Sequence, residues 1–231
     1  MGSFPLESLI CYNWDSKIRV GKEGDGGYVI ASNLEYDLLI GCGIADDDSF
    51  EIEFLKKNPD IEGYAFDGSI ESLPTPDISR LNFIKKNITG EESENTTNLH
   101  GLISSYSNVF LKMDIEGYEF PWICSLSREQ LNKFKQITIE FHRPFHEMGA
   151  HCLEQLARSH YLIHFHGNSC CKTRQVKNIT VPNVFECTYL RKADIEAVPL
   201  LSDKSVPSPL DRINAYSEDI HLSGFPYSIN K

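Results

Sequence analysis

The sequence has 231 residues, with 33 acidic and 22 basic side chains and a formal net charge of −11. This length suits one domain, or one domain with an extension, and is sufficient to bury a hydrophobic core. The 41% of apolar residues excludes a wholly disordered chain. The excess of acidic over basic residues argues against a nucleic-acid-binding protein, because binding to phosphate backbones requires clustered Lys and Arg.

The sequence contains no stretch with the length and apolar character of a membrane span, and no basic segment followed by an apolar run opens it. We therefore expect a cytoplasmic protein. Seven cysteines without a C-x-x-C pair indicate reduced thiols in a reducing compartment. The first residues, Met1-Gly2-Ser3, are typical of a cloning remnant. They suggest that the sequence is one module of a longer, multidomain protein.

After a mixed lead-in segment with a glycine cluster at residues 24–27, short apolar runs alternate with helical patterns along the chain. A helix is expected to begin at Asp48 or Ser49 and to end near Asn58-Pro59, and a capping-box pattern occurs at Ser127-x-x-Gln130. The predicted strands cover residues 36–40, 64–66, 81–84, 109–113, 137–141, 161–165 and 184–190, and the other predicted helices cover 97–106, 119–134 and 152–159.

Alternating strands and helices predict βαβ units, and thus an α/β domain with a mostly parallel sheet and helices on both faces. The last two predicted strands are joined by a long loop without a helical pattern, which predicts an antiparallel pair at one edge. We expect the domain to cover residues 1–198, with residues 1–35 as its lead-in segment. Residues 199–231 are expected to form an irregular extension that packs on the domain.

Ligands of open α/β sheets bind beyond the carboxyl ends of the strands. Four predicted strands end in glycines and carboxylates: Gly41-Cys42-Gly43, Asp67-Gly68-Ser69, Asp114-Ile115-Glu116-Gly117 and Glu140-Phe141-His142. Any one of them could be a turn chosen for its backbone conformation alone. Four such endings at one edge of a sheet predict a cofactor and substrate site.

The turn that begins at Gly41 distinguishes between cofactor classes. A dinucleotide site has the pattern G-x-G-x-x-G, with helix amides facing a pyrophosphate. Here Asp46 replaces the third glycine, and Asp47 and Asp48 follow where a diphosphate would lie. This acidity disfavours NAD and suits a cationic cofactor without phosphate, such as S-adenosylmethionine. Asp67 is placed to accept hydrogen bonds from ribose hydroxyls. The expected cofactor-binding residues are Gly41, Gly43, Asp46, Asp67, Gly68 and Ser69.

The segment Leu111-Lys112-Met113-Asp114-Ile115-Glu116-Gly117-Tyr118-Glu119 resembles the signature of FkbM-type methyltransferases. Residues 24–28 and 41–51, and Glu140-Phe141-His142 with the later strand into His166-Gly167-Asn168, are similar to other segments of this family. The resemblance spans roughly residues 20–192. It implies a Rossmann-like class I fold with a seven-stranded sheet, and methyl transfer from S-adenosylmethionine to oxygen, commonly a sugar or polyketide hydroxyl.

Methyl transfer to a hydroxyl needs in-line alignment of oxygen, carbon and sulfur, and help in removing the hydroxyl proton. Asp114, Glu116 and His142 are the expected catalytic residues. In one version of the reaction, Asp114, Glu140 and His142 bind Mg²⁺ or Mn²⁺ through mixed oxygen and nitrogen ligands. In the metal-free version, His142 or Glu116 is the general base. Both versions remain open at this stage.

His164 and His166 share one side of a predicted strand, and a solvated face of an edge strand explains them better than catalysis. The expected reaction is O-methylation of a carbohydrate or another small hydroxyl-bearing substrate, without nucleic acid as a partner, by one module of a larger multidomain glycan-modifying protein. Two alternatives remain open. One is O-methylation of an RNA ribose or cap, against which the charge of −11 counts. The other is a non-catalytic Rossmann-like module that binds a nucleotide.

Overall fold

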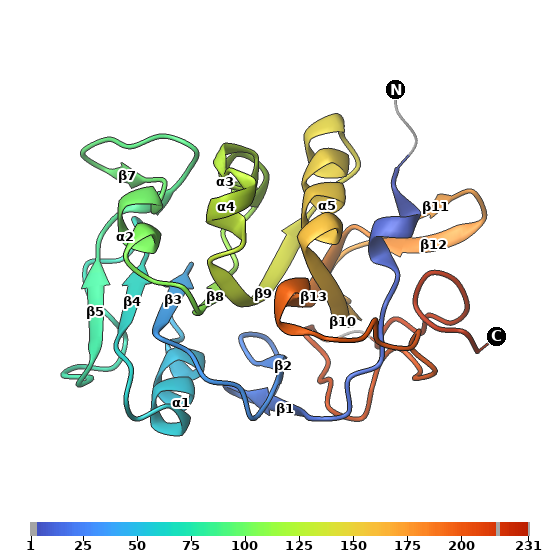
Figure 1. Cartoon of the computed structure of the whole chain (residues 1–231), viewed down its shortest axis with the longest axis horizontal. Helices are drawn as coiled ribbons and strands as arrows, with labels where there is room; N and C mark the ends of the chain where they lie inside the picture. The colour runs from blue at the N-terminus through green and yellow to red at the C-terminus, as the bar shows by residue number, and fades with distance from the viewer. Residues whose placement is uncertain (1–3, 216–217, 231) are drawn as a thin grey trace.

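The computed structural model describes residues 4–215 and 218–230, so the sequence Met1-Gly2-Ser3 lies outside the described residues. A seven-stranded sheet forms the centre, with the strand order β10-β13-β9-β8-β3-β4-β5 (Figure 1). Its strands are β3 (Leu38–Cys42), β4 (Gly63–Phe66), β5 (Leu81–Ile84), β8 (Val109–Met113), β9 (Phe134–His142), β10 (His160–Gly167) and β13 (Val184–Arg191).

Strand β13 runs antiparallel to both of its neighbours, β9 and β10. The other neighbouring pairs of this sheet are parallel. The predicted mostly parallel seven-stranded sheet with an antiparallel edge pair is therefore confirmed. The long connection between the last two strands carries a hairpin, β11 (Thr173–Val176) and β12 (Ile179–Pro182), where we expected only a loop.

The two faces of the sheet bury different elements because side chains of each strand alternate between them. Leu38 and Ile40 of β3 join the cluster that includes residues of the helices α2 (His100–Ser104), α3 (Glu119–Ser125), α4 (Arg128–Leu131) and α5 (Glu147–Ser159). Leu39 joins the opposite cluster with Phe50 of α1 (Ser49–Lys57) and Ile30 of a hairpin. Helices thus cover both faces of the sheet, as predicted. On the face that carries α1, a hairpin packs beside the helix.

This hairpin consists of β1 (Lys17–Val20) and β2 (Tyr28–Ala31), and it lies in the segment that we expected to be a mixed lead-in. The 3-10 turn η1 (Leu6–Leu9) precedes it and packs near α5. The remaining short elements are β6 (Asn87–Ile88), β7 (Thr96–Thr97) and η2 (Lys192–Asp194). The sequence analysis missed β2 although its apolar run is as long as those of β4 and β5, because its partner β1 alternates with basic residues and the pairing is visible only in the folded chain.

The predicted helix over residues 119–134 is divided into α3 and α4 at the expected capping box. Ser127 Oγ accepts a hydrogen bond from the backbone N–H of Gln130, and Gln130 Oε1 accepts one from the N–H of Ser127. The reciprocal bonds satisfy two helix-end donors and so favour a new helix start at this point.

The chain after residue 198 has little regular structure, and it packs against the domain through Val206, Leu222 and Tyr227. The ring of Tyr227 lies 4.8 Å from that of Phe165 on β10. Among the described residues, no helix combines the length and the apolar character needed to cross a bilayer.

Candidate functional site

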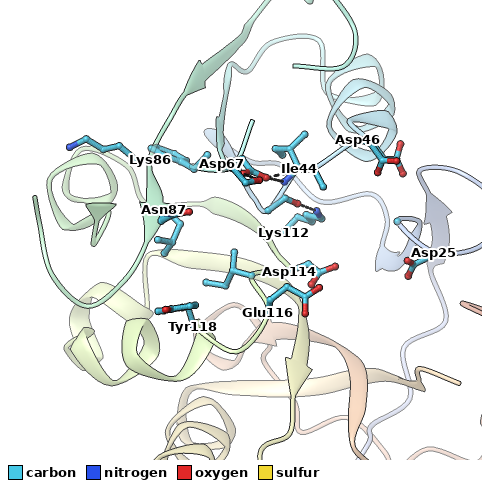
Figure 2. Close-up of a pocket in the computed structure, with 18 of the residues that line it drawn as sticks. Asp25, Ile44, Asp46, Asp67, Lys86, Asn87, Lys112, Asp114, Glu116 and Tyr118 are labelled. Atoms are coloured by element: carbon cyan, nitrogen blue, oxygen red, sulfur yellow. Dashed lines mark hydrogen bonds between the residues drawn. The ribbon is translucent and has the colours of Figure 1, made fainter. Parts of the chain in front are cut away.

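A cavity of about 510 Å³ opens at the carboxyl ends of β3, β4 and β8 (Figure 2). Its walls come from the loop before β2, from the turns after these three strands, and from β6. Of the expected cofactor-binding residues, Gly43, Asp46, Asp67 and Ser69 line it, whereas Gly41 and Gly68 do not. Asp114 and Glu116 also line the cavity, and His142 and Glu140 lie outside its wall.

The two glycines of the first turn serve different purposes. Gly43 has a φ of +76°, and a Cβ there would lie 1.6 Å from the carbonyl oxygen of Asp114, so only glycine allows the ends of β3 and β8 to approach. Gly41 is a buried residue within β3, and a Cβ on it would lie 2.5 Å from Glu51 Oε1. Gly41 thus makes room for a carboxyl group of α1.

Asp67 connects the turns after β3 and β4. Its Oδ2 accepts hydrogen bonds from the backbone N–H groups of Ile44 and Ala45, both at 2.9 Å, and its Oδ1 accepts from the N–H and hydroxyl of Ser69. Burial raises the pKa of Asp67, but these hydrogen bonds outweigh it and hold the pKa below its ordinary value. Asp67 is therefore an ionised acceptor at the cavity wall, and Gly68 beside it packs against Asn87.

The three carboxylates that precede α1, Asp46, Asp47 and Asp48, have different surroundings in the structure. Asp46 is exposed at the cavity wall, and Asp47 forms an ion pair with Lys22 at 3.0 Å. Asp48 is buried and accepts hydrogen bonds from the backbone and hydroxyl of Thr75. The cavity thus has less acid at this turn than the sequence suggests.

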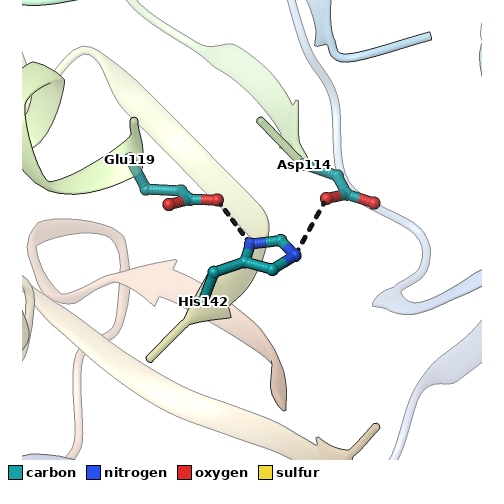
Figure 3. A group of neighbouring side chains, drawn as sticks. All are labelled: Asp114, Glu119 and His142. Carbon is teal, nitrogen blue, oxygen red and sulfur yellow. Dashed lines mark hydrogen bonds and ion pairs between the residues drawn. The ribbon is translucent and has the colours of Figure 1, made fainter. Parts of the chain in front are cut away.

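A group of carboxylates surrounds His142 at the end of β9 (Figure 3). Nδ1 of His142 lies 2.8 Å from Oε1 of Glu119, the first residue of α3. Nε2 lies 3.8 Å from Asp114 Oδ1, 3.5 Å from Glu116 Oε2 and 3.7 Å from Glu140 Oε1. The structure therefore brings together all four expected catalytic and metal-binding residues.

Glu119 is the fifth member of this group, and the sequence analysis gave it no function although it closes the signature at residues 111–119. Its carboxyl group is fully buried, and Oε2 has no hydrogen-bond partner among the described residues. Asp114 also receives a hydrogen bond on Oδ2 from the hydroxyl of Tyr28, at 3.1 Å. The sequence signal for Glu119 would have been its place as the acidic last residue of the signature and the first residue of a predicted helix.

The crowding of carboxylates changes the protonation of the group. Burial, followed by the charges of Asp114 and Glu186, raises the pKa of Glu140 well above its ordinary value. Burial lowers the pKa of His142, but the hydrogen bond that His142 donates to Glu119 and the surrounding negative charges outweigh it and raise the pKa overall. His142 thus readily takes up a proton here.

Residues 12–167 match the methyltransferase FkbM domain, and this match includes the cavity turns and the group around His142. The chain belongs to the FkbM methyltransferase family. It therefore has the fold and the cofactor class of the S-adenosylmethionine-dependent methyltransferases, which confirms the resemblance seen in the signature.

No curated protein matches the sequence. Among solved structures, a putative methyltransferase from Thermoplasma acidophilum is 11% identical with a TM-score of 0.38, and the alignment covers 71% of each chain. Precorrin-6y C5,15-methyltransferase from Geobacter metallireducens is 14% identical with a TM-score of 0.40, covering 69% of this chain and 82% of that one. TrmN from Thermus thermophilus is 10% identical with a TM-score of 0.36, covering 68% of this chain and 44% of TrmN.

The oxygen and nitrogen donors around His142 in this FkbM domain fit a Mg²⁺ or Mn²⁺ ion. Donor atoms of Asp114, Glu119 and His142 all lie within 4.8 Å of one another. Asp114 Oδ1 and Glu119 Oε2 are buried atoms without hydrogen-bond partners among the described residues. Glu140 Oε1, which we expected as a ligand, accepts a hydrogen bond from Asn168 at 2.9 Å and lies 3.7 Å from His142 Nε2, the ring nitrogen that also faces Asp114.

Two other histidines of the FkbM domain, His164 and His166 on β10, are buried. Nε2 of His164 lies 2.8 Å from Asp211 Oδ1, and Nε2 of His166 lies 3.0 Å from Asp219 Oδ1. The expectation of a solvated strand face is therefore wrong, because the chain after residue 198 covers this face and supplies a carboxylate to each histidine.

Proposed function

We propose that this FkbM domain transfers the methyl group of S-adenosylmethionine to a hydroxyl group of a sugar or glycan. The observation that carries the proposal is the arrangement Glu119–His142–Asp114, which stands beside the cofactor cavity. A sugar hydroxyl is a weak nucleophile at neutral pH, so its methylation needs a group that removes the proton. Asp114 and Glu116 line the cavity. Nε2 of His142 lies within 4 Å of a carboxylate oxygen of each of them, at 3.8 Å and 3.5 Å.

Support for the cofactor site comes from the charges of the cavity. Asp25 and Asp46 give its wall negative charge that suits the ammonium and sulfonium groups. Asp67 is placed to bind ribose. Its two oxygens already accept four hydrogen bonds, so a ribose hydroxyl would replace the hydroxyl of Ser69. Phe66 and Ile88 provide apolar surface for the adenine ring.

His142 is suited to proton removal because its two nitrogens have different surroundings. Glu119 fixes the ring through Nδ1, which leaves Nε2 directed at the carboxylates of Asp114, Glu116 and Glu140. As general base, His142 would take the acceptor proton on Nε2, and the nearby carboxylates would stabilise the imidazolium that results. This is the usual relation between a catalytic histidine and the carboxylate that orients it.

The same geometry supports a metal-assisted version. Asp114, Glu140 and His142 Nε2 would hold the ion, and Glu119 would orient the histidine from the other nitrogen, as carboxylates commonly do behind metal-bound histidines. A bound Mg²⁺ or Mn²⁺ would lower the pKa of the acceptor hydroxyl. Because the pKa of Glu140 is raised, ion binding would release a proton and strengthen with pH.

The choice of a carbohydrate is supported by one aromatic side chain. Tyr118 lines the cavity and is 59% exposed, directly after the signature residues that carry the chemistry. An exposed aromatic ring with a hydroxyl can stack on a sugar face and hydrogen-bond at its rim.

Calorimetry with S-adenosylmethionine tests the cofactor assignment. The wild type is expected to bind it, and Asp67→Ala to bind it more weakly because both turns lose their shared acceptor. NADH provides the control ligand and should not bind. Failure of the wild type to bind S-adenosylmethionine at high concentration would remove the basis of the proposal.

Transfer of a labelled methyl group to a panel of glycans, with RNA as the competing acceptor, tests the reaction. Asp114→Asn should bind the cofactor as the wild type does and should transfer no label. A chelator during the assay separates the metal-assisted version, which loses turnover, from the metal-free version. Label on RNA and none on glycans would contradict the acceptor class.

A further inference from the structure

Three lysines line the cavity, and they differ in their partners. Lys22 forms an ion pair with Asp47 at 3.0 Å, and Lys86 forms one with Glu92 at 3.1 Å. Lys112 is 5% exposed, and within the described part of the chain no carboxylate oxygen lies within ion-pairing distance of its Nζ. It donates one hydrogen bond, to the carbonyl oxygen of Gly43 at 2.6 Å (Figure 2).

The position of Lys112 follows from the register of the sheet. It lies on β8 directly opposite Gly41 of β3, and it alternates with Leu111 and Met113, whose side chains pack against the helices on the other face. Its side chain therefore lies on the side of α1 and the hairpin. There Nζ is 5.7 Å from the centre of the Tyr28 ring.

Glu51 of α1 is the nearest candidate for a permanent partner, but it does not serve as one. Its side chain is fully buried, and neither carboxyl oxygen has a hydrogen-bond partner among the described residues. Burial raises the pKa of Glu51, although the charge of Lys112 acts in the opposite direction. The ammonium group of Lys112 thus has three N–H donors, one protein acceptor and a position in the cavity wall.

We propose that Lys112 binds the carboxylate of the methionine part of the cofactor. This inference rests on the proposed use of S-adenosylmethionine. That cofactor has two cationic groups and one anionic group, and the acid-rich wall suits the first two only. Burial of a lysine without an anionic partner is unfavourable, and a carboxylate ligand would supply that partner through charge-assisted hydrogen bonds. The bond to Gly43 keeps the ammonium at the turn that borders the cofactor.

A purely structural function for Lys112, in which it only holds the Gly43 turn, predicts a different binding pattern. The two can be separated with decarboxylated S-adenosylmethionine, which has the same adenosine, sulfonium and amine but lacks the carboxylate. We expect the wild type to bind S-adenosylmethionine about 10- to 100-fold more tightly than this analogue, as for a buried charge-assisted hydrogen bond. Lys112→Met should bind both ligands equally, with its affinity for the analogue close to that of the wild type.

Matched variants complete the calorimetric experiment. Lys22→Met and Lys86→Met should keep the preference for the carboxylate, since these lysines already have carboxylate partners. Lys112→Gln retains an N–H donor for Gly43 without the charge, so it should lose the preference even where Lys112→Met folds poorly. Melting temperatures of all four variants report whether each one is folded.

Each outcome has one meaning. A wild type that binds both ligands equally, or a Lys112→Gln variant that keeps the preference, overturns the inference while leaving cofactor use intact. Equal weakening of both ligands by the Lys112 variants shows that the lysine holds only the turn, and it overturns the inference as well. A wild type that binds neither ligand contradicts the proposed function itself.

Discussion

His142 and the pair His164 and His166 are both surrounded by carboxylates, but the two groups differ in how completely those carboxylates are used. Near His142, buried oxygens of Asp114 and Glu119 lack hydrogen-bond partners within the described ranges, and Asp114 lines the cavity. Around His164, Asp211 is buried and accepts from the histidine and from the N–H of Ser208. Buried polar groups are normally satisfied, so the unpaired oxygens of Asp114 and Glu119 contrast with those of Asp211. Nδ1 of His166 also lacks a hydrogen-bond partner among the described residues, so the contrast is one between the carboxylates.

The carboxylates that surround the two groups of histidines also come from different parts of the chain. Glu116 and Glu119 belong to the same signature as Asp114, within the matched residues 12–167. Asp211 and Asp219 come from the chain after residue 198, beyond that match. The comparison teaches that histidines on two strands of one sheet can receive carboxylate partners of different origin, from the signature for His142 and from the C-terminal segment for His164 and His166.

The largest effect is expected for His142→Gln. Loss of the base or metal ligand should reduce methyl transfer about 10²- to 10⁴-fold, while S-adenosylmethionine binding stays unchanged. Label transfer to the acceptor measures the first quantity and calorimetry the second. His164→Gln is the matched control and should keep its turnover per folded molecule. Equal losses in the two variants would remove the distinction between the groups.

Asp211→Ala should lower the free energy of unfolding by about 3 to 5 kcal/mol, because it leaves His164 buried without its partner. Cofactor affinity should not change. Urea unfolding followed by circular dichroism measures the loss. The control is Asp203→Ala, which removes an exposed pair with Lys204 and should change stability very little. A small effect of Asp211→Ala would show that the C-terminal segment is not held by this pair.

His166 should make stability depend on pH. Burial lowers its pKa, but Glu186, Asp211 and Asp219 outweigh it and raise the pKa from 6.5 to about 9. The protonated form is favoured in the folded state, so this stabilisation is complete below pH 6.5 and is lost as the pH rises to 9. The shift corresponds to about 3 kcal/mol. Urea unfolding between pH 6 and pH 9 should show the decline in the wild type and not in His166→Asn.

Asp211 should make the stability of the protein depend on pH in the acidic range. Burial raises its pKa, but the charge and hydrogen bond of His164 outweigh it and lower the pKa from 3.8 to about 2. The ionised form is favoured in the folded state, so its stabilisation is present above pH 3.8 and is lost as the pH falls to 2. Unfolding at low pH should therefore be less steep in Asp211→Asn than in the wild type.

Glu119→Gln should weaken Mn²⁺ binding about 10- to 100-fold, the usual consequence of changing the partner behind a metal-bound histidine. Electron paramagnetic resonance of free Mn²⁺ measures this affinity. Glu129→Gln, in the first turn of α4, is the control and should bind as the wild type does. No Mn²⁺ binding by the wild type would favour the metal-free version of the reaction.

The smallest effect on stability is expected for a substitution that lies outside the group around His142 and the group around His164 and His166. Ser127→Ala removes one half of the capping box at the start of α4 and should cost about 1 kcal/mol of stability. Neither Mn²⁺ binding nor cofactor binding should change. A change in either one would show that α4 is coupled to the site.

Much of the fold was predictable because its signals are local. The apolar runs of β8 and β13 and the turn residues after β3 and β4 can be recognised in a few residues each. The hairpin β1–β2 was missed, because its two strands are recognised only when they pair across the glycine cluster and pack against α1 and β9. The functions of Gly41 and Asp48 were also hidden, because Glu51 and Thr75 contact them only in the folded chain.

The sequence by itself determined the alternation of strands and helices, the turn that disfavours a diphosphate, and the signature that contains Asp114 and Glu116. These features depend on residues close together in the chain. The tertiary structure decided that Glu119 orients His142, that Lys112 faces the cavity with no carboxylate partner among the described residues, and that the C-terminal segment buries His164. These contacts join residues on separate elements, and they follow from strand order, register and the path of the covering segment, which no local pattern encodes.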